Sequence, residues 1–107
     1  MATGILGTPA DLAAATNTTI YTVPAETFAV LTISVANRSV QSRTVRVALA
    51  NSDTPTTAEW IEFDSELIAN GVLERSGVVI DAGKKVVVYA DSTDVTVMVY
   101  GIETPTA

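Results

Sequence analysis

Four carboxylates lie within one short stretch of this sequence: Glu59, Glu62, Asp64 and Glu66. A pair of carboxylates can act as acid and base in glycoside hydrolysis, and carboxylate oxygens can hold a cation. However, Glu62 and Asp64 alternate with Ile61 and Phe63, which is the pattern of a strand with one solvated face. We therefore interpret the cluster chiefly as a solvated strand face, with a cation site and catalysis as the alternatives.

A second group of oxygen-bearing side chains is formed by Asp91, Ser92, Thr93 and Asp94. Its spacing matches no EF-hand loop, and Asx-turn hydrogen bonding explains these residue types without a metal. The sequence contains no His and no Cys, which excludes Ser-His-Asp and Cys-His nucleophiles as well as disulfides. The two Gly-rich phosphate-binding patterns, GxGxxG and GxxxxGK followed by Ser or Thr, are both absent from the sequence. We expect no enzymatic activity, no cofactor and no metal.

The charge balance limits the kinds of partner that this protein is expected to bind. Lys and Arg number 6 against 12 Asp and Glu, and the net charge is −6. Nucleic acids and anionic membranes attract clustered basic residues, so we expect neither as a partner. No apolar run is long enough for a transmembrane helix. The first residues lack the basic and apolar regions of a secretory signal, so we expect none.

The elements that must position these residues are strands. Turn signals separate seven stretches rich in β-branched or alternating apolar residues: 18–23, 27–37, 43–50, 59–65, 72–80, 85–89 and 95–103. Short strands at this regular spacing predict a single all-β domain, an antiparallel β-sandwich of the jelly-roll or immunoglobulin-like kind. The stretches 72–80 and 85–89 flank a four-residue turn in which Gly83 is free to take a positive φ. We expect them to pair as a hairpin.

Residues 1–17 are interpreted as an N-terminal arm, flexible or extended, attached to a sandwich domain over residues 18–107. Thr8 and Pro9, followed by Asp11, instead resemble the start of a single helical turn. The arm carries two large apolar side chains, Ile5 and Leu6. We treat their docking on a neighbouring subunit as a hypothesis.

The last predicted strand is apolar on both faces. Val95, Val97 and Val99 share one face, while the other carries Met98, Tyr100 and Ile102 with only Thr96 polar. Covering three such side chains would remove about 400 Å² from water, on the order of 10 kcal/mol before entropy costs. Either another subunit covers this face, or Trp60 with Phe28 provides the contact, or a loop or the arm covers the face. The candidate interface residues are Ile5, Leu6, Phe28, Trp60, Met98, Tyr100 and Ile102.

Several short sequences occur in a characteristic order: YTVPA at 21–25, ANR at 36–38, VRVAL at 45–49, EWIEFD at 59–64, NGVLER at 70–75 and VMVYG at 97–101. Over residues 18–103 this succession resembles a group of small virion structural proteins of tailed bacteriophages, including phages of cyanobacteria. In this comparison Pro24, Asn70, Gly71 and Gly101 have structural roles in turns or at a close backbone approach, and no functional residue is transferred.

The resemblance implies an all-β module of the virion, assembled in the host cytoplasm, without activity or cofactor. Its partners would be copies of itself and a major capsid protein or tail component. A capsid decoration or cement protein is the first interpretation, and a tail, neck or fibre accessory protein is the alternative. A module that binds a host glycan through Trp60, Tyr21, Tyr89 and Tyr100 is a further hypothesis.

Overall fold

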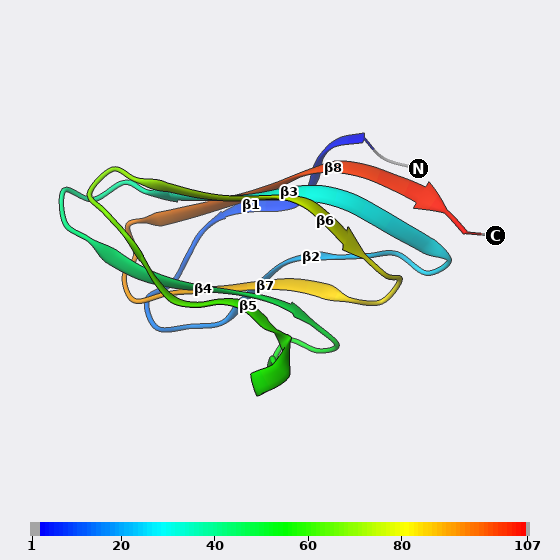
Figure 1. Ribbon diagram of the computed structural model, residues 1–107, viewed down its shortest axis with the longest axis horizontal. Coiled ribbons are helices and arrows are strands. Elements are labelled where there is room, and N and C mark those ends of the chain that lie inside the picture. The colour runs from blue at the N-terminus through cyan, green and yellow to red at the C-terminus, as the bar shows by residue number, and fades with distance from the viewer. Residues whose placement is uncertain (1–2, 107) are drawn as a thin grey trace.

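The computed structural model describes residues 3–106 as two four-stranded antiparallel sheets packed face to face (Figure 1). The strands are β1 (Thr3–Asp11), β2 (Thr18–Thr22), β3 (Thr27–Asn37), β4 (Arg43–Ala50), β5 (Trp60–Leu67), β6 (Val72–Ile80), β7 (Lys85–Ala90) and β8 (Val95–Pro105), with one 3₁₀ turn, η1 (Thr57–Glu59). Sheet A has the order β1-β8-β3-β6, and sheet B has the order β2-β7-β4-β5. The predicted all-β sandwich is confirmed, with one strand more than the seven expected.

The strand pairing follows a single rule. Strand β1 pairs with β8, β2 with β7, β3 with β6, and β4 with β5, as if one long hairpin had been rolled up. The pairs β3–β8 and β4–β7 then complete the two sheets. This is the topology of an eight-stranded jelly roll, one of the two sandwich types that the sequence predicted.

The predicted hairpin between 72–80 and 85–89 is wrong, although both strands and the turn exist. Strand β6 pairs with β3 in sheet A, whereas β7 pairs with β2 and β4 in sheet B. Between them, the Lys84 amide donates to the Asp81 carbonyl over 3.2 Å, and Gly83 has a φ of 81°. The turn carries the chain from one sheet to the other, and both Ile80 at the end of β6 and Val86 on β7 are buried in the shared core.

The N-terminal segment also differs from the expectation. Residues 3–11 form strand β1, with Ile5 opposite Tyr100 and Leu6 opposite Val99 on β8, and contain no helical turn at Pro9. Leu6 and Leu12 are buried in the core at 2% and 1% exposure. Their burial ties this segment to the sandwich, so residues 3–11 of the expected arm form an edge strand and residues 12–17 connect it to β2. Residues 1 and 2 of that arm lie outside the described residues.

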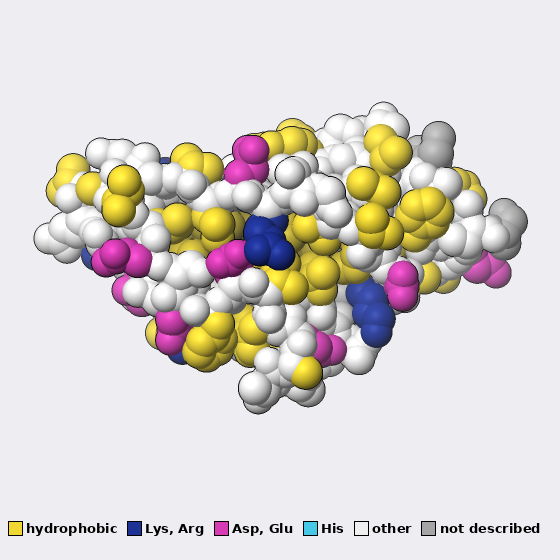
Figure 2. All heavy atoms as spheres, viewed as in Figure 1, with side chains coloured by type: hydrophobic (Ala, Val, Ile, Leu, Met, Phe, Trp, Pro, Cys, Tyr) yellow, Lys and Arg dark blue, Asp and Glu magenta, His cyan; other side chains and the backbone are white. Residues whose placement is uncertain are grey.

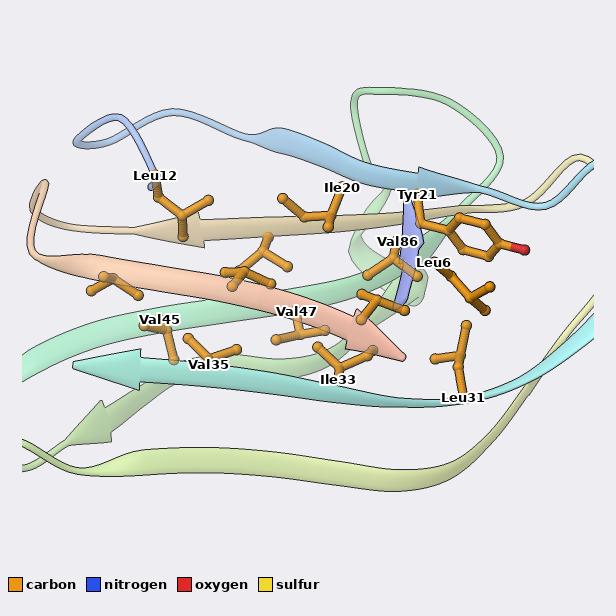
Figure 3. Close-up of a cluster of buried hydrophobic side chains, with 14 of the residues drawn as sticks. Leu6, Leu12, Ile20, Tyr21, Leu31, Ile33, Val35, Val45, Val47 and Val86 are labelled. Carbon is orange, nitrogen blue, oxygen red and sulfur yellow. The ribbon is translucent and has the colours of Figure 1, made fainter. Parts of the chain in front are cut away.

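The core lies between the sheets and is built from the inward face of each strand (Figure 3). As the alternation predicted, Leu31, Ile33 and Val35 on β3 are buried, as are Val45 and Val47 on β4. The three valines of β8, at positions 95, 97 and 99, are also fully buried. Both sheets therefore contribute to a single hydrophobic core.

Asn37 is the one buried polar residue among the described residues, at 3% exposure. Its side-chain amide donates to the carbonyls of Gln41, Leu67 and Ile68 over 2.9, 3.1 and 3.0 Å, and its Oδ1 accepts from the Ser39 amide. The side chain thereby satisfies carbonyls in the β3–β4 loop and at the end of β5. It fixes the end of β3 relative to the edge of sheet B.

Candidate interaction surfaces

The carboxylates around β5 have specific partners. Glu62 Oε2 lies 2.7 Å from Arg75 Nη1, and Asp64 Oδ1 lies 2.6 Å from Arg46 Nε. Glu59 accepts hydrogen bonds from the backbone amides of Thr56 and Asn51, and the Thr56 bond is the main reason why the pKa of Glu59 is lowered. These groups therefore act in ion pairs and a cap. Within residues 3–106, no group of three or more potential ligands is arranged around a metal position.

The loop that contains Asp91 and Asp94 holds a local side-chain hydrogen bond, but its acceptor is Ser92 rather than an aspartate, so the expected Asx turn is wrong. The Asp94 amide donates to Ser92 Oγ over 3.2 Å, and the Asp91 amide donates to the Thr44 carbonyl over 3.0 Å. Asp94 Oδ2 lies 3.0 Å from Arg43 Nη2. Local hydrogen bonds and one ion pair thus account for the oxygen-rich residues of this loop.

The outer surface of sheet A carries a row of apolar side chains near the end where both termini lie. We define the sheet A patch as Ile5, Phe28, Val30, Val79, Met98, Tyr100 and Ile102. The strand register places Ile5 opposite Tyr100, and Val30 opposite both Ile102 and Val79. Figure 2 shows hydrophobic side chains gathered at this end of the molecule, on the upper right.

Much of the sheet A patch is open to solvent. Val79, Ile5 and Ile102 are 63%, 57% and 46% exposed. Strand β1 adds Ile5 to this face and pairs at its side, so the expected alternative, in which the N-terminal segment covers the face, does not hold for residues 3–11. Toward the other end of the face, Ser34 lies between Met98 and Glu74 in the strand register, and the Tyr100 hydroxyl donates to Glu74 Oε2 over 3.1 Å. Polar groups therefore border Met98 and Tyr100 at this end of the patch.

Five of the seven predicted interface residues therefore share one face, and the other two do not. Leu6 is buried between the sheets and is unavailable to a neighbouring subunit. Trp60 lies on β5 in sheet B, so it cannot form a common surface with Phe28 on β3 in sheet A. Instead, Trp60 packs on a small cluster formed by Ala48, Ala50 and Val87.

The outer surface of sheet B carries an aromatic cluster around one arginine. The guanidinium carbon of Arg46 lies 4.1 Å from the centre of the Phe63 ring and 4.6 Å from that of Tyr89. The Trp60 and Phe63 rings meet edge to face, with centres 5.6 Å apart and planes at 69°. Arg46, Thr57, Trp60 and Phe63 line a pocket of about 460 Å³, which we call the aromatic pocket.

The sequence pattern misplaced Phe63. Alternation put it on the inward face with Ile61, but the β4–β5 register shifts between Val45 and Val47, and Asp64 has a φ of 53°. This irregularity turns Phe63 outward beside Arg46, where it is 55% exposed, while Ile61 packs against the core. The pocket combines residues from β4, β5 and η1, and the pattern within any one strand gives no sign of it.

The four aromatics proposed for glycan recognition do not form one site. Tyr21 is buried in the core, where its hydroxyl donates to Glu103, and burial followed by that bond raises its pKa. Tyr100 belongs to sheet A, and of the four only Trp60 and Tyr89 lie on the outer surface of sheet B. A site that used all four is therefore excluded.

The fold and the two outer surfaces define a jelly-roll β-sandwich with an uncovered apolar patch on one sheet and an aromatic pocket on the other. No protein-family model matches the chain, and comparisons with the curated proteins and with the solved structures found no match. Within residues 3–106, no helix has the length and apolar character needed to cross a membrane.

Proposed function

We propose that this chain is a non-enzymatic structural component of a tailed-phage virion, a capsid decoration protein that binds the shell through the sheet A patch. The resemblance of residues 18–103 to small phage virion proteins supports the proposal. The jelly roll is a common architecture of viral particle proteins, which supports it by analogy of fold.

The observation that carries the proposal is the exposure of the sheet A patch. Contiguous apolar surface on a soluble protein marks an interaction site, because leaving it in water is unfavourable. Here the large side chains come from four neighbouring strands of one sheet and present a rigid surface. A rigid apolar face loses little conformational entropy on binding, which suits a permanent contact with the major capsid protein or another copy.

The test uses phage shells prepared without this chain. We expect the purified protein to cosediment with the shells and to raise the temperature at which they break. Ile102→Asp places a charge in the middle of the patch and should abolish both effects. Val40→Asp makes the same kind of change at a loop residue that is 83% exposed, and it should leave both effects intact.

Two outcomes contradict the decoration role. Labelling of one vertex or of the tail tip in electron micrographs would indicate a tail, neck or fibre accessory protein instead. Failure of the wild-type protein to bind any phage particle, with its fold verified by circular dichroism, would overturn the virion assignment as a whole.

A further inference from the structure

We propose that the aromatic pocket on sheet B binds a neutral sugar residue of a glycan. The pocket lies on the sheet opposite to the sheet A patch, so this proposal does not depend on the virion assignment. A particle protein attached through sheet A would leave sheet B facing outward. The two surfaces can therefore work at the same time.

The shape of the pocket suits a pyranose ring. Trp60 and Phe63 meet at 69°, so their rings form two walls of a corner rather than one flat surface. A pyranose has an apolar face of C–H groups, which stacks on an aromatic ring, and an edge of hydroxyl groups. The volume of about 460 Å³ is within the range of small-molecule sites and has room for one or two sugar residues.

Arg46 supplies fixed hydrogen-bond donors in this corner. Its guanidinium is held between the Phe63 and Tyr89 rings, and its Nε donates to Asp64 Oδ1 over 2.6 Å. Among the described residues, its side chain has no other hydrogen-bond partner, so the Nη groups can donate to sugar hydroxyls. Because the surrounding groups hold this side chain in place, binding would cost little side-chain entropy. Thr57, which also lines the pocket, carries a hydroxyl group that can both donate and accept a hydrogen bond.

The local charges favour a neutral ligand. Asp64 balances the charge of Arg46, and Glu66 is exposed on the same strand in a protein of net charge −6. These carboxylates would repel an acidic sugar, and the guanidinium would repel a cationic ligand. A neutral polyol with one apolar face avoids both costs and uses both the rings and the donors.

Trp60 is the only tryptophan in the chain, so its fluorescence reports directly on the pocket. The probes are neutral tetrasaccharides of glucose, galactose and mannose, titrated separately to 20 mM, roughly tenfold above a weak 2 mM site. We expect a saturable change in emission with at least one of them, unaffected by 0.5 M salt. Phe63→Leu removes one ring wall and should weaken binding at least tenfold. Tyr100→Leu makes a comparable change on sheet A and should have no effect.

Three results would overturn the proposal. The first is an unchanged emission spectrum with all three probes, confirmed by unchanged amide chemical shifts around β5. The second is equal affinity in the wild type and in a folded Phe63→Leu variant. The third is tighter, salt-sensitive binding of an oligosaccharide of uronic acids, which would assign the pocket to an acidic ligand. None of these results bears on shell binding by the sheet A patch.

Discussion

Arg75 on β6 and Glu62 on β5 form an ion pair, with Nη1 and Oε2 2.7 Å apart, that links sheet A to sheet B along one side of the sandwich. These two strands are the outermost members of their sheets on that side, and no backbone ladder joins them. Glu62 is also held by Ser65, whose hydroxyl donates to Oε1 over 2.7 Å. The pair therefore closes a side of the sandwich that the strand pairing leaves open.

Removing the charge of one member of this pair should destabilise the fold slightly. We expect Glu62→Gln to lower the free energy of unfolding in urea by about 0.5–1 kcal/mol, because the pair is only partly shielded from solvent. The loss should shrink in 1 M NaCl. Glu66→Gln, an exposed carboxylate on the same strand, is the matched control and should be neutral. Equal losses in the two variants would contradict a specific role for the pair.

The neighbouring residues Ile5 and Leu6 test whether the N-terminal segment is a strand. Leu6 is fully buried and Ile5 lies on the sheet A patch. We expect Leu6→Ala to cost about 2–5 kcal/mol of unfolding free energy, the usual range for a buried leucine, and Ile5→Ala to cost well under 1 kcal/mol. Thermal and urea unfolding measure both. A Leu6→Ala variant as stable as the wild type would show that this segment is an arm after all.

Gly101 sits where β8 approaches β3 closely. A Cβ atom at this position would lie 2.1 Å from the Val30 carbonyl oxygen and 2.7 Å from the Leu31 Cα. Because both contacts are with backbone, Gly101→Ala should cost at least about 3 kcal/mol or prevent folding. In Gly83→Ala, at a positive φ but in open space, we expect a loss of only about 1 kcal/mol. Comparable expression and melting temperatures for the two variants would contradict the close approach of β8 to β3 at Gly101.

The titration of Tyr21 makes the free energy of unfolding depend on pH in the alkaline range. Burial and, after it, the bond to Glu103 raise the pKa of its hydroxyl above the usual 10.0, so the folded protein keeps this proton at a pH where the unfolded chain loses it. The resulting contribution to stability is complete below pH 10 and declines as the pH rises above 10.

Tyr21→Phe removes the titrating group and the hydrogen bond. We expect the variant to be about 0.5–1.5 kcal/mol less stable than the wild type at pH 7, and this difference to narrow between pH 10 and 11.5. Urea titrations at pH 7, 9, 10.5 and 11.5 measure it. A difference that stays constant over this range would show that Tyr21 does not titrate differently in the folded and unfolded states.

The strands were predictable because burying one face of a sheet imposes a two-residue period on the sequence. The alternation of Val95, Val97 and Val99 identified the inward face of β8. The same alternation placed Met98, Tyr100 and Ile102 on the outward face, where the structure has them. The close backbone approach expected at Gly101 is also present, since a Cβ there would lie 2.1 Å from the Val30 carbonyl oxygen.

The sequence did not determine which strands are partners. Every strand offers the same backbone donors and acceptors, so the pairing of β6 with β3 rather than β7 depends on how both sheets share one core. Strand β1 was not predicted for the same reason, because its sequence of glycines and a short apolar stretch forms a strand only through its pairing with β8. The aromatic pocket likewise required the irregular β5 backbone at Asp64, because that irregularity brings Phe63 to Arg46 from a different strand.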